Sequence, residues 1–192
     1  MTMKKVFKDI INKIEIECMK HSILMREELI RPEMLKDFDC GEEGLNNYFH
    51  DAYGSTMEGR ENTFMVTFRG KIVALYTIKA GIILENWDSH AKFDTSSACE
   101  LVNFALRKEY RGHKLGEKIF QKVIWKRLRR IERAGMPIRY ITLYALPKPE
   151  LLKYYEEELG FKRLPLMYEA FLEEKIKPRY DRGCIFMYKS FH

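Results

Sequence analysis

The sequence predicts an α/β fold in which helices cover both faces of a mixed β-sheet. Two apolar stretches joined by a tight turn predict a hairpin in the first half of the chain. A strand, a long amphipathic helix and a second strand follow the hairpin, and a shorter helix with two strand-like stretches ends the chain. Because strands and helices alternate in this second half, we expect them to share one sheet.

The N-terminal part of the chain predicts helices on either side of one short strand. Residues 1–20 carry apolar side chains at helical spacing with charged ones between them, so they predict an amphipathic helix and not a secretion signal. Residues 22–29 are a candidate strand, and residues 33–57 are mainly helical with a break around Asp39-Cys40-Gly41. Asp39 or the residues just after it are expected to cap the second helical piece. After the first helix, residues 21–192 are expected to form a single domain.

The hairpin is the strongest strand signal in the middle of the chain. Residues 63–68 and 71–80 are apolar stretches on either side of the turn Arg69-Gly70. Residues 86–97 are mostly polar and predict a loop, after which residues 100–106 predict a third strand.

The clearest helix follows that strand. Its apolar stripe consists of Leu115, Ile119, Phe120, Val123, Ile124, Leu128 and Ile131. Gly135 stands where a left-handed residue ends a helix, and Pro137 prevents continuation. Residues 138–145 then form a mostly apolar strand, as expected in the middle of a covered sheet. The remaining predicted elements are a helix at 149–159 that ends at Gly160, and strands near 161–167 and 184–191.

The composition is that of a globular protein with a substantial core. The chain has 192 residues, of which 46% are hydrophobic and 32% are charged, and no apolar run is long enough to cross a bilayer. A cytoplasmic protein without a membrane partner is therefore expected. The net charge of +6 can attract nucleic acid, acidic protein or a phosphorylated cofactor.

The cysteines argue against a metal site. They lie far apart, without a C-x-x-C pair or a histidine at zinc-finger spacing, so no metal is expected. Reduced thiols fit a cytosolic protein. The four residues are Cys18, Cys40, Cys99 and Cys184.

The join between the third strand and the long helix predicts an anion site. The start of a helix presents unpaired backbone N–H groups and the positive end of the helix dipole, and Gly112 and Gly116 allow a close approach. Arg111 and Lys114 add positive charge, and an arginine can bind two phosphate oxygens at once. The alternative is a tight connection whose basic side chains are only solvated. The chain has neither the P-loop pattern nor the dinucleotide pattern G-x-G-x-x-G.

The segment Tyr110–Glu117 resembles the acyl-CoA pyrophosphate loop of the GNAT superfamily of N-acetyltransferases. That loop has the pattern R/Q-x-x-G-x-G/A, and Arg111 and Gly116 match its first and last positions. Lys114 stands at the middle glycine position and departs from the pattern. The resemblance covers about residues 38–161.

Three flanking segments extend the resemblance. The apolar strand Leu101–Leu106 runs into the loop as in the family, and Leu151–Phe161 is similar to the family ending F-Y-x-x-x-G-F with one extra residue before Gly160. Phe38-Asp39-Cys40-Gly41, followed by Leu45-Asn46 and Tyr48, resembles a GNAT branch that includes toxins acetylating aminoacyl-tRNA.

The resemblance implies a GNAT-like, mostly antiparallel sheet and acetyl-CoA as co-substrate. The strand backbone before the loop would pair with the pantetheine arm, and the N–H of Leu106 would donate to the thioester oxygen. The implied cofactor-binding residues are Phe104, Ala105, Leu106, Arg111, Gly112, His113, Lys114, Leu115, Gly116 and Glu117.

Two residues are candidates for the chemistry. Glu100 resembles the catalytic glutamate of histone-acetylating members and is our candidate general base; the alternative is a carboxylate exposed at a strand end or paired with a lysine. Tyr155 is our candidate general acid, with Tyr154 as its competitor because of the extra residue before Gly160. Aromatic packing is the alternative for both tyrosines.

The predicted function is direct transfer of an acetyl group from acetyl-CoA to a primary amine of unknown class. One alternative is an aminoacyl-tRNA-acetylating toxin of the same fold, and another is a non-catalytic module that binds CoA or RNA. The basic residues of the long helix are either a solvated face or an RNA contact. They include Lys118, Lys122, Lys126, Arg129 and Arg133. A homodimer is left open.

Overall fold

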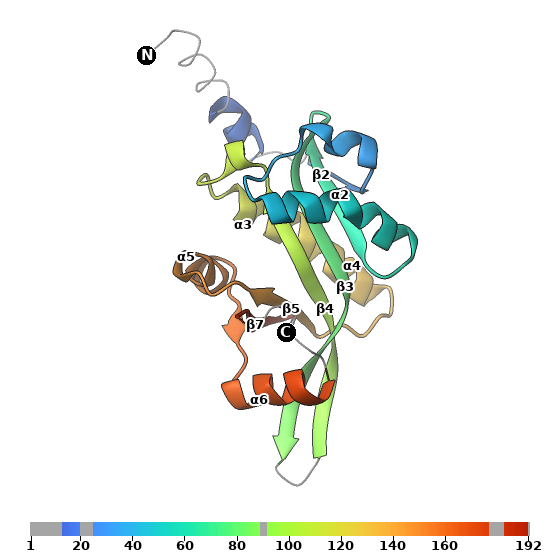
Figure 1. Ribbon diagram of the computed structural model, residues 1–192, viewed down its shortest axis with the longest axis vertical. Coiled ribbons are helices and arrows are strands. Elements are labelled where there is room, and N and C mark those ends of the chain that lie inside the picture. The colour runs from blue at the N-terminus through green and yellow to red at the C-terminus, as the bar shows by residue number, and fades with distance from the viewer. Residues whose placement is uncertain (1–12, 20–24, 89–91, 177–182, 192) are drawn as a thin grey trace. The chain divides into compact units, whose positions relative to one another are not determined.

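The computed structural model describes residues 13–19, 25–88, 92–176 and 183–191 (Figure 1). Residues 13–19 are helical, and the label η marks short 3-10 or π-helical segments. The elements up to the candidate loop are β1 (Arg26–Leu29), η1 (Pro32–Asp37), α2 (Glu43–Met57), β2 (Asn62–Phe68), β3 (Lys71–Asp88), β4 (Lys92–Leu106) and η2 (Lys108–Tyr110). Those after it are α3 (Leu115–Ile119), η3 (Phe120–Ile124), α4 (Trp125–Arg133), β5 (Tyr140–Ala145), α5 (Pro149–Lys153), η4 (Tyr154–Glu158), β6 (Lys162–Arg163), α6 (Leu166–Phe171), η5 (Leu172–Ile176) and β7 (Ile185–Ser190).

The described strands form one sheet in the order β1-β2-β3-β4-β5-β7-β6. Strand β1 pairs with β2 in antiparallel fashion, and β7 does so with both β5 and β6. Strand β4 pairs with β5 in parallel. A mixed and mostly antiparallel sheet with helices confirms the predicted fold class.

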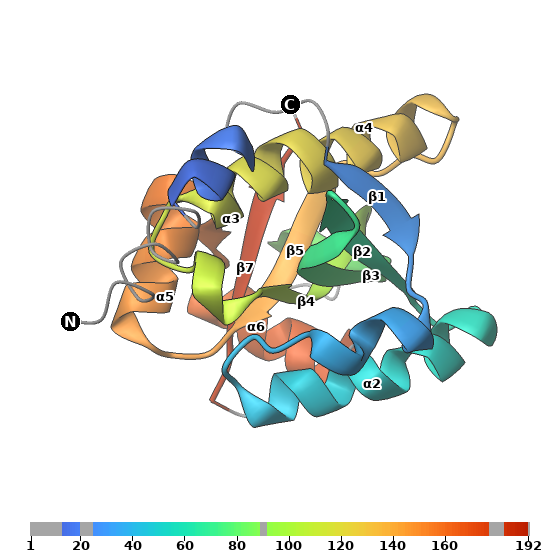
Figure 2. The same ribbon diagram turned by 90° about the horizontal axis from the view of Figure 1, so that it is seen from above.

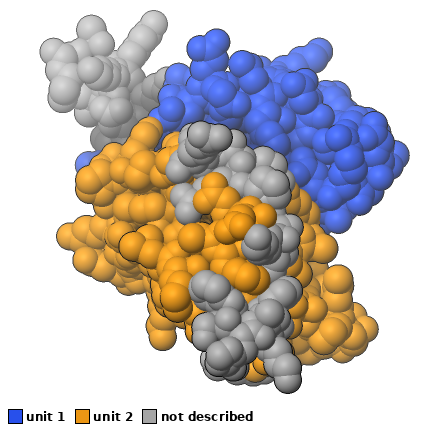
Figure 3. Space-filling view, turned by 60° about the horizontal axis from the view of Figure 1, so that its bottom comes forward, with its two compact units in different colours: residues 1–77, 103–126 blue, residues 78–102, 127–192 orange. Residues whose placement is uncertain are grey.

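The chain divides into two compact units, coloured in Figure 3. The first unit comprises residues 1–77 and 103–126, and the second comprises residues 78–102 and 127–192. Strands β3 and β4 and the helical stretch 115–133 each contribute residues to both units. The single domain expected after residue 20 stays a prediction.

The core of the first unit lies between α2 and the strands. Phe49 and Ala52, one helical turn apart, are 1% and 2% exposed, and they belong to one apolar cluster with Met65 of β2 and Leu75 of β3. Within this unit, Figure 2 shows α2 on one side of β2 and β3, and α3 on the other. Helices therefore flank both faces of this part of the sheet, as predicted.

The core of the second unit is built around β7. Phe186 forms an apolar cluster with Ile83 of β3, Leu164 and Leu172. Glu169 of α6 is buried among these residues, and its Oε1 accepts the backbone N–H of Phe186 at 2.9 Å. This bond satisfies a buried carboxylate, which would otherwise destabilise the core.

The predicted loop at residues 86–97 is wrong. Strand β3 continues to Asp88 and strand β4 begins at Lys92, so most of this polar segment is strand. The polar side chains nearby satisfy one another, because Glu85 accepts from the Tyr140 hydroxyl at 2.6 Å and pairs with Arg139 at 3.1 Å. Polar composition suggested a loop, whereas cross-strand polar contacts allow a strand.

The predicted strand at residues 161–167 is mostly wrong as well. Only Lys162–Arg163 pair with β7, and the helix α6 begins at Leu166 after Pro165. Proline has a fixed φ that suits a helix start, and Leu166 and Met167 are 83% and 59% exposed, so their apolar character did not mark a buried strand.

The other predicted elements are confirmed in kind. Within the predicted strand at 22–29, β1 starts at Arg26; the predicted N-terminal helix appears at 13–19, and the rest of it lies outside the described residues. The long helix spans residues 115–133 with a π-helical turn at η3, and Gly135 has the expected positive φ of 97°. Among the described residues, no helix combines the length and apolar character needed to cross a membrane.

Candidate active site

The candidate cofactor loop is a short, sharply bent connection in the first unit. One 3-10 turn, η2, leads into Arg111, Gly112 has a positive φ of 78°, and Lys114 immediately precedes α3. Leu115 begins the helix and is completely buried. Because that side chain belongs to the core, Leu115 can contribute only its backbone to a ligand.

Lys114 adopts the conformation that a glycine would supply. Its φ of 56° and ψ of 16° lie in the left-handed region, which a non-glycine residue occupies at a cost of about 1 kcal/mol. This region is restricted for lysine but not closed to it, so the departure from the family pattern does not require a different bend.

The start of α3 presents backbone donors beside basic side chains. The first helical bond runs from the Lys118 N–H to the Lys114 carbonyl at 3.4 Å, so the N–H groups of residues 115–117 lie ahead of it. Arg111 and Lys114 are exposed, and His113 is half-buried. The Glu117 carboxylate accepts from Gln121 at 3.0 Å along the helix. The predicted loop thus combines two exposed basic side chains with the backbone donors of a helix start, a combination that suits an anion.

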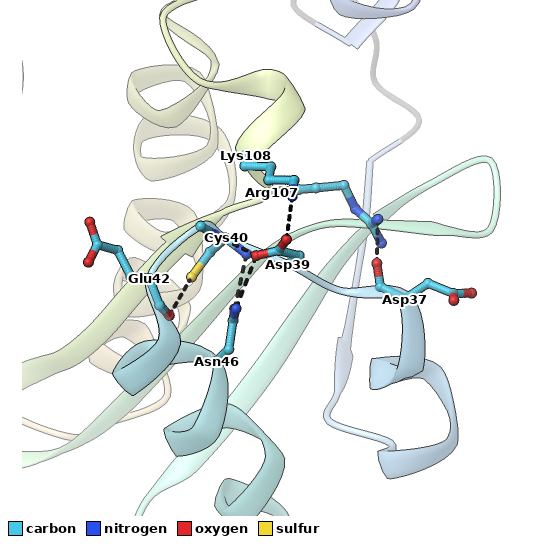
Figure 4. A network of polar contacts seen from close by, with 8 residues as sticks. Asp37, Asp39, Cys40, Glu42, Asn46, Arg107 and Lys108 are labelled. Atoms are coloured by element: carbon cyan, nitrogen blue, oxygen red, sulfur yellow. Dashed lines mark hydrogen bonds and ion pairs between the residues drawn. The ribbon is translucent and has the colours of Figure 1, made fainter.

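The segment before α2 contacts the residues just before the loop (Figure 4). Asp39 pairs with the Lys108 ammonium at 2.6 Å, and Arg107 donates to the Asp37 carbonyl at 2.6 Å. Of the predicted caps, Asp39 or the residues just after it, the N-cap position of α2 falls to Glu42, which forms no side-chain cap bond, while Asp39 accepts from Gly41 and from Asn46. Its side chain bonds within the turn and to Lys108, which competes with capping.

The strand backbone before the loop is well defined. Ala105 is buried in the core of the first unit, while Phe104 and Leu106 are half-buried. The N–H of Arg107 donates to the Val73 carbonyl at 2.9 Å, which holds the end of β4 against β3. These residues therefore lie on a fixed strand, with side chains that alternate between its two faces.

Strand β4 pairs with β5 over a short register only. Ala98, Cys99 and Glu100 pair with Tyr140–Thr142, and within the described residues the register ends there. Beyond Thr142, Leu143–Ala145 continue to pair with β7 on the other edge of β5. The β4-facing edge of these three residues consequently offers backbone groups to an extended ligand.

Glu100 lies at the end of this register and is 2% exposed. Its Oε1 is 3.5 Å from the Nζ of Lys79, so the sequence alternative of pairing with a lysine is realised. A Cβ at position 81 would lie 3.3 Å from the backbone nitrogen of Glu100, and Gly81 leaves that space open. The Oγ1 of Thr142, which is opposite Glu100, has no hydrogen-bond partner among the described residues.

The charge of Glu100 affects its neighbour. Burial, and then the negative charge of Glu100, raise the pKa of the Cys99 thiol to about 12. Cys99 is 4% exposed and stays protonated at neutral pH, so it is not a ready nucleophile.

Tyr155 lies in the π-helical segment η4 of the second unit. Its ring meets Phe161 edge-on with centroids 5.7 Å apart, and the ring of Tyr154 is 5.6 Å away. Burial raises the pKa of the Tyr155 phenol to about 12. The phenol is therefore protonated at neutral pH, as a proton donor must be.

The extra residue before Gly160 is accommodated by the π turn. The N–H of Leu159 donates to the Tyr154 carbonyl at 3.2 Å, a bond that spans five residues instead of four. The helix thus gains one residue without losing its end at Gly160, whose φ is 71°. Lys189 of β7 donates to the Leu159 carbonyl at 2.7 Å and holds the end of this helix in place.

Sequence reasoning missed the partners of the candidate residues. Lys79 pairs with Glu100, Lys108 pairs with Asp39, and Lys189 binds the helix that carries Tyr155. Lys79 and Lys189 had a visible signal, since each is a charged residue inside an otherwise apolar strand. The pairing of Lys108 had none, because its partner is distant in the sequence.

No protein-family model matches the chain, and no curated protein matches it. Solved structures do match. One described as a bacterial toxin has a TM-score of 0.65 at 16% identity, covering 86% of this chain and 90% of the toxin. The toxin AtaT, as a mutant bound to the C-terminus of the antitoxin AtaR and acetyl-CoA, has a TM-score of 0.58 at 16% identity over 85% of this chain and 92% of its own.

AtaT complexed with acetyl-methionyl-tRNAfMet gives a TM-score of 0.60 at 15% identity, over 84% of this chain and 93% of AtaT. At such identities, the likeness shows the fold. The chain has the fold of these toxins, which is the GNAT-like fold that the sequence predicted.

The left-handed turn at Lys114 predicts opposite effects for two glycine substitutions. Lys114→Gly should raise the free energy of unfolding by up to about 1 kcal/mol, because glycine occupies this region without strain. Lys118→Gly, inside α3, should lower it by about 1 kcal/mol. Urea denaturation measures both, and equal losses for the two variants would show that residue 114 is not left-handed.

Proposed function

We propose that this chain is an acetyl-CoA-dependent N-acetyltransferase that moves the acetyl group directly to a primary amine. The observation that carries the proposal is the loop from Arg111 to Glu117, where a left-handed turn leads into the start of a helix and two basic side chains, Arg111 and Lys114, are exposed. A toxin of the same fold has been solved with acetyl-CoA. A helix start of this kind suits the pyrophosphate of coenzyme A.

The strand backbone that runs into the loop supports a place for the pantetheine arm. An extended chain with amide groups can pair with exposed strand backbone as an added strand would. We assign this role to the backbone of Phe104, Ala105 and Leu106, with the Leu106 N–H as donor to the thioester oxygen. Arg111 and the N–H groups of residues 115–117 would hold the pyrophosphate.

Glu100 is the proposed general base. An ammonium has no lone pair, so the acceptor nitrogen must lose a proton before it attacks the thioester carbon. The Nζ of Lys79 lies 3.5 Å from Oε1 of Glu100 and holds this side chain in place. Burial at 2% exposure keeps this carboxylate out of bulk water.

Tyr155 is the proposed general acid. As the carbon–sulfur bond breaks, the departing thiolate gains a negative charge, and the phenol proton neutralises it. The raised pKa keeps that proton on the phenol at neutral pH. AtaT and KacT have both been solved as mutants in which a phenylalanine replaces a tyrosine, the same kind of change as Tyr155→Phe.

Two substitutions test the catalytic assignment. Glu100→Gln and Tyr155→Phe should each lower kcat by about 100- to 10,000-fold, because each removes one proton-transfer group. Both should leave the calorimetric Kd for acetyl-CoA within about two-fold, since neither residue is assigned to cofactor binding. Tyr154→Phe, the matched control, should retain activity.

The dependence of kcat on pH tests the assignment of Tyr155 separately. The Tyr155 pKa is raised, so the active protonated phenol persists above pH 10 and is lost only as the pH approaches about 12.

A chain that binds acetyl-CoA but acetylates no amine, in wild type and variants alike, would instead be a non-catalytic binding module.

An aminoacyl-tRNA is the acceptor that specific observations favour. AtaT, which has this fold, was solved with acetyl-methionyl-tRNAfMet. In this chain, Lys126, Arg130 and Arg133 of α4 are exposed along one helix and can meet RNA phosphates. Arg129 does not belong to this surface, because it pairs with Glu132 at 2.8 Å and lies over the Phe191 ring.

Acceptor assays distinguish a tRNA substrate from a small amine. With acetyl-CoA saturating, aminoacyl-tRNA should be acetylated with a KM that rises steeply with salt, because phosphate contacts release counterions. Lys126→Ala should raise that KM and reduce the salt slope by about 1. Lys36→Ala, an exposed lysine of η1, is the charge-matched control. A salt-independent KM, or free amino acids acetylated equally well, would contradict the RNA assignment.

A further inference from the structure

We propose that Asp39 is a positioning residue for the acyl-CoA loop and acts through Lys108. This inference rests on the proposed function, because it assigns to the segment before α2 the task of holding the loop in its binding conformation. Both residues belong to the first unit, and their side chains are 43% and 60% exposed. We call Asp39, Asn46 and Lys108 the clamp.

The Asp39 carboxylate uses both of its oxygens. Oδ1 accepts the Gly41 N–H at 2.7 Å and the Asn46 amide at 3.0 Å, and Oδ2 lies 2.6 Å from the Lys108 ammonium (Figure 4). The bonds from Lys108, then Asn46, then Gly41 hold the pKa of Asp39 well below its usual range. The carboxylate is therefore fixed from within its own segment and directed at Lys108.

The backbone reinforces the same contact. The Lys108 N–H donates to the Asp39 carbonyl at 2.9 Å. Next to it, the Arg107 guanidinium donates to the carbonyls of Ile72 at 2.8 Å and Asp37 at 2.6 Å, and it lies over the Phe38 ring. Lys108 is consequently attached to the segment before α2 through both its backbone and its side chain.

One helical turn separates this attachment from the predicted phosphate contact. The N–H of Arg111 donates to the Lys108 carbonyl at 3.3 Å, so a fixed Lys108 fixes the backbone that places Arg111. Gly41 packs in the same place, since a Cβ there would lie 3.5 Å from Lys108 Cβ and 3.7 Å from Arg111 Nη1. The other end of the loop is held by the buried Leu115. Tyr110, just before Arg111, is buried as well, so the clamp adds a polar attachment to an end of the loop that the core also holds.

The residue types around Asp39 suit its contact with Lys108. Gly41 has a φ of 81°, which favours glycine and lets the chain turn back on the Asp39 carboxylate. Asn46 donates to that carboxylate and accepts the Cys40 N–H at 3.0 Å, so one side chain fixes two positions. Phe38 supplies the buried ring beneath Arg107. Each residue supports the contact between Asp39 and Lys108.

Electrostatics alone makes the opposite prediction for Asp39. A carboxylate near a site for an anionic cofactor repels it, so removing the charge should tighten binding if distance and charge were all that mattered. A positioning role requires weaker binding when the same charge is removed. The sign of the change thus separates the two explanations.

The test is the calorimetric Kd of the full chain for CoA, with Asp39→Asn as the central variant. Asparagine keeps an oxygen for Gly41 and Asn46 but loses the ion pair, so the Kd should rise about three- to ten-fold. Lys108→Met should raise it similarly, and the double variant should be no worse than the weaker-binding single one. The kcat with saturating acetyl-CoA should stay within about two-fold, because the clamp acts on binding.

Glu58→Gln is the matched control. Glu58 pairs with Arg60 at 2.7 Å in the same unit, and both side chains are exposed, at 63% and 66%. Its loss removes the same charge and should leave the Kd for CoA unchanged. If Asp39→Asn does not fold, Asn46→Ala carries the test, because it removes one support of the Asp39 carboxylate without changing a charge, and its Kd for CoA should also rise. The melting temperature of the free protein shows whether that variant folds.

The outcomes are distinct. A wild-type Kd retained in Asp39→Asn and Lys108→Met, or tighter binding in Asp39→Asn, overturns the clamp while the proposed function stands. A fall in melting temperature with unchanged affinity also overturns it, because the contacts would then serve stability only. A wild-type chain that binds no CoA defeats the proposed function, and the clamp with it.

Discussion

The left-handed turn at Lys114 determines where the start of α3 points, and the buried side chain of Leu115 anchors that start in the core. Backbone donors at a helix start cannot be redirected by side-chain rotation, so the turn decides what the loop can bind. Arg111 then adds a charge whose position depends on the chain before it. The candidate cofactor site thus depends mainly on the direction of its backbone N–H groups, and its basic side chains add to it.

The candidate chemistry depends on buried polar groups that have partners. Glu100 is almost fully buried and remains compatible with the fold because Lys79 lies beside it and Gly81 makes room for its backbone. Tyr155 lies in a helix whose π turn and Lys189 contact absorb one additional residue. The positions of Glu100 and Tyr155 therefore depend on these contacts and not on the loop from Arg111 to Glu117.

The sequence predicted most helices and strands because their apolar periodicities are long and regular, as in the stripe from Leu115 to Leu128. It failed where polarity was taken as a sign of a loop, because residues 86–97 are mostly strand. It also failed where apolar residues were taken as a sign of burial, as at Leu166. The loop could be predicted from its own residues. Lys79 stands out as a charged residue in an apolar strand, but its pairing with Glu100, like the pairing of Lys108 with Asp39, depends on contacts between distant segments, which no local pattern encodes.

Hydrogen exchange of backbone amides with and without acetyl-CoA tests the central claim, that the loop from Arg111 to Glu117 binds the cofactor. The claim predicts slower exchange in residues 111–117 and 104–106 when acetyl-CoA is added, because their N–H groups gain acceptors. Residues 166–171 of α6 should exchange at an unchanged rate. Protection confined to other segments, with the loop unaffected at saturating acetyl-CoA, would contradict the claim.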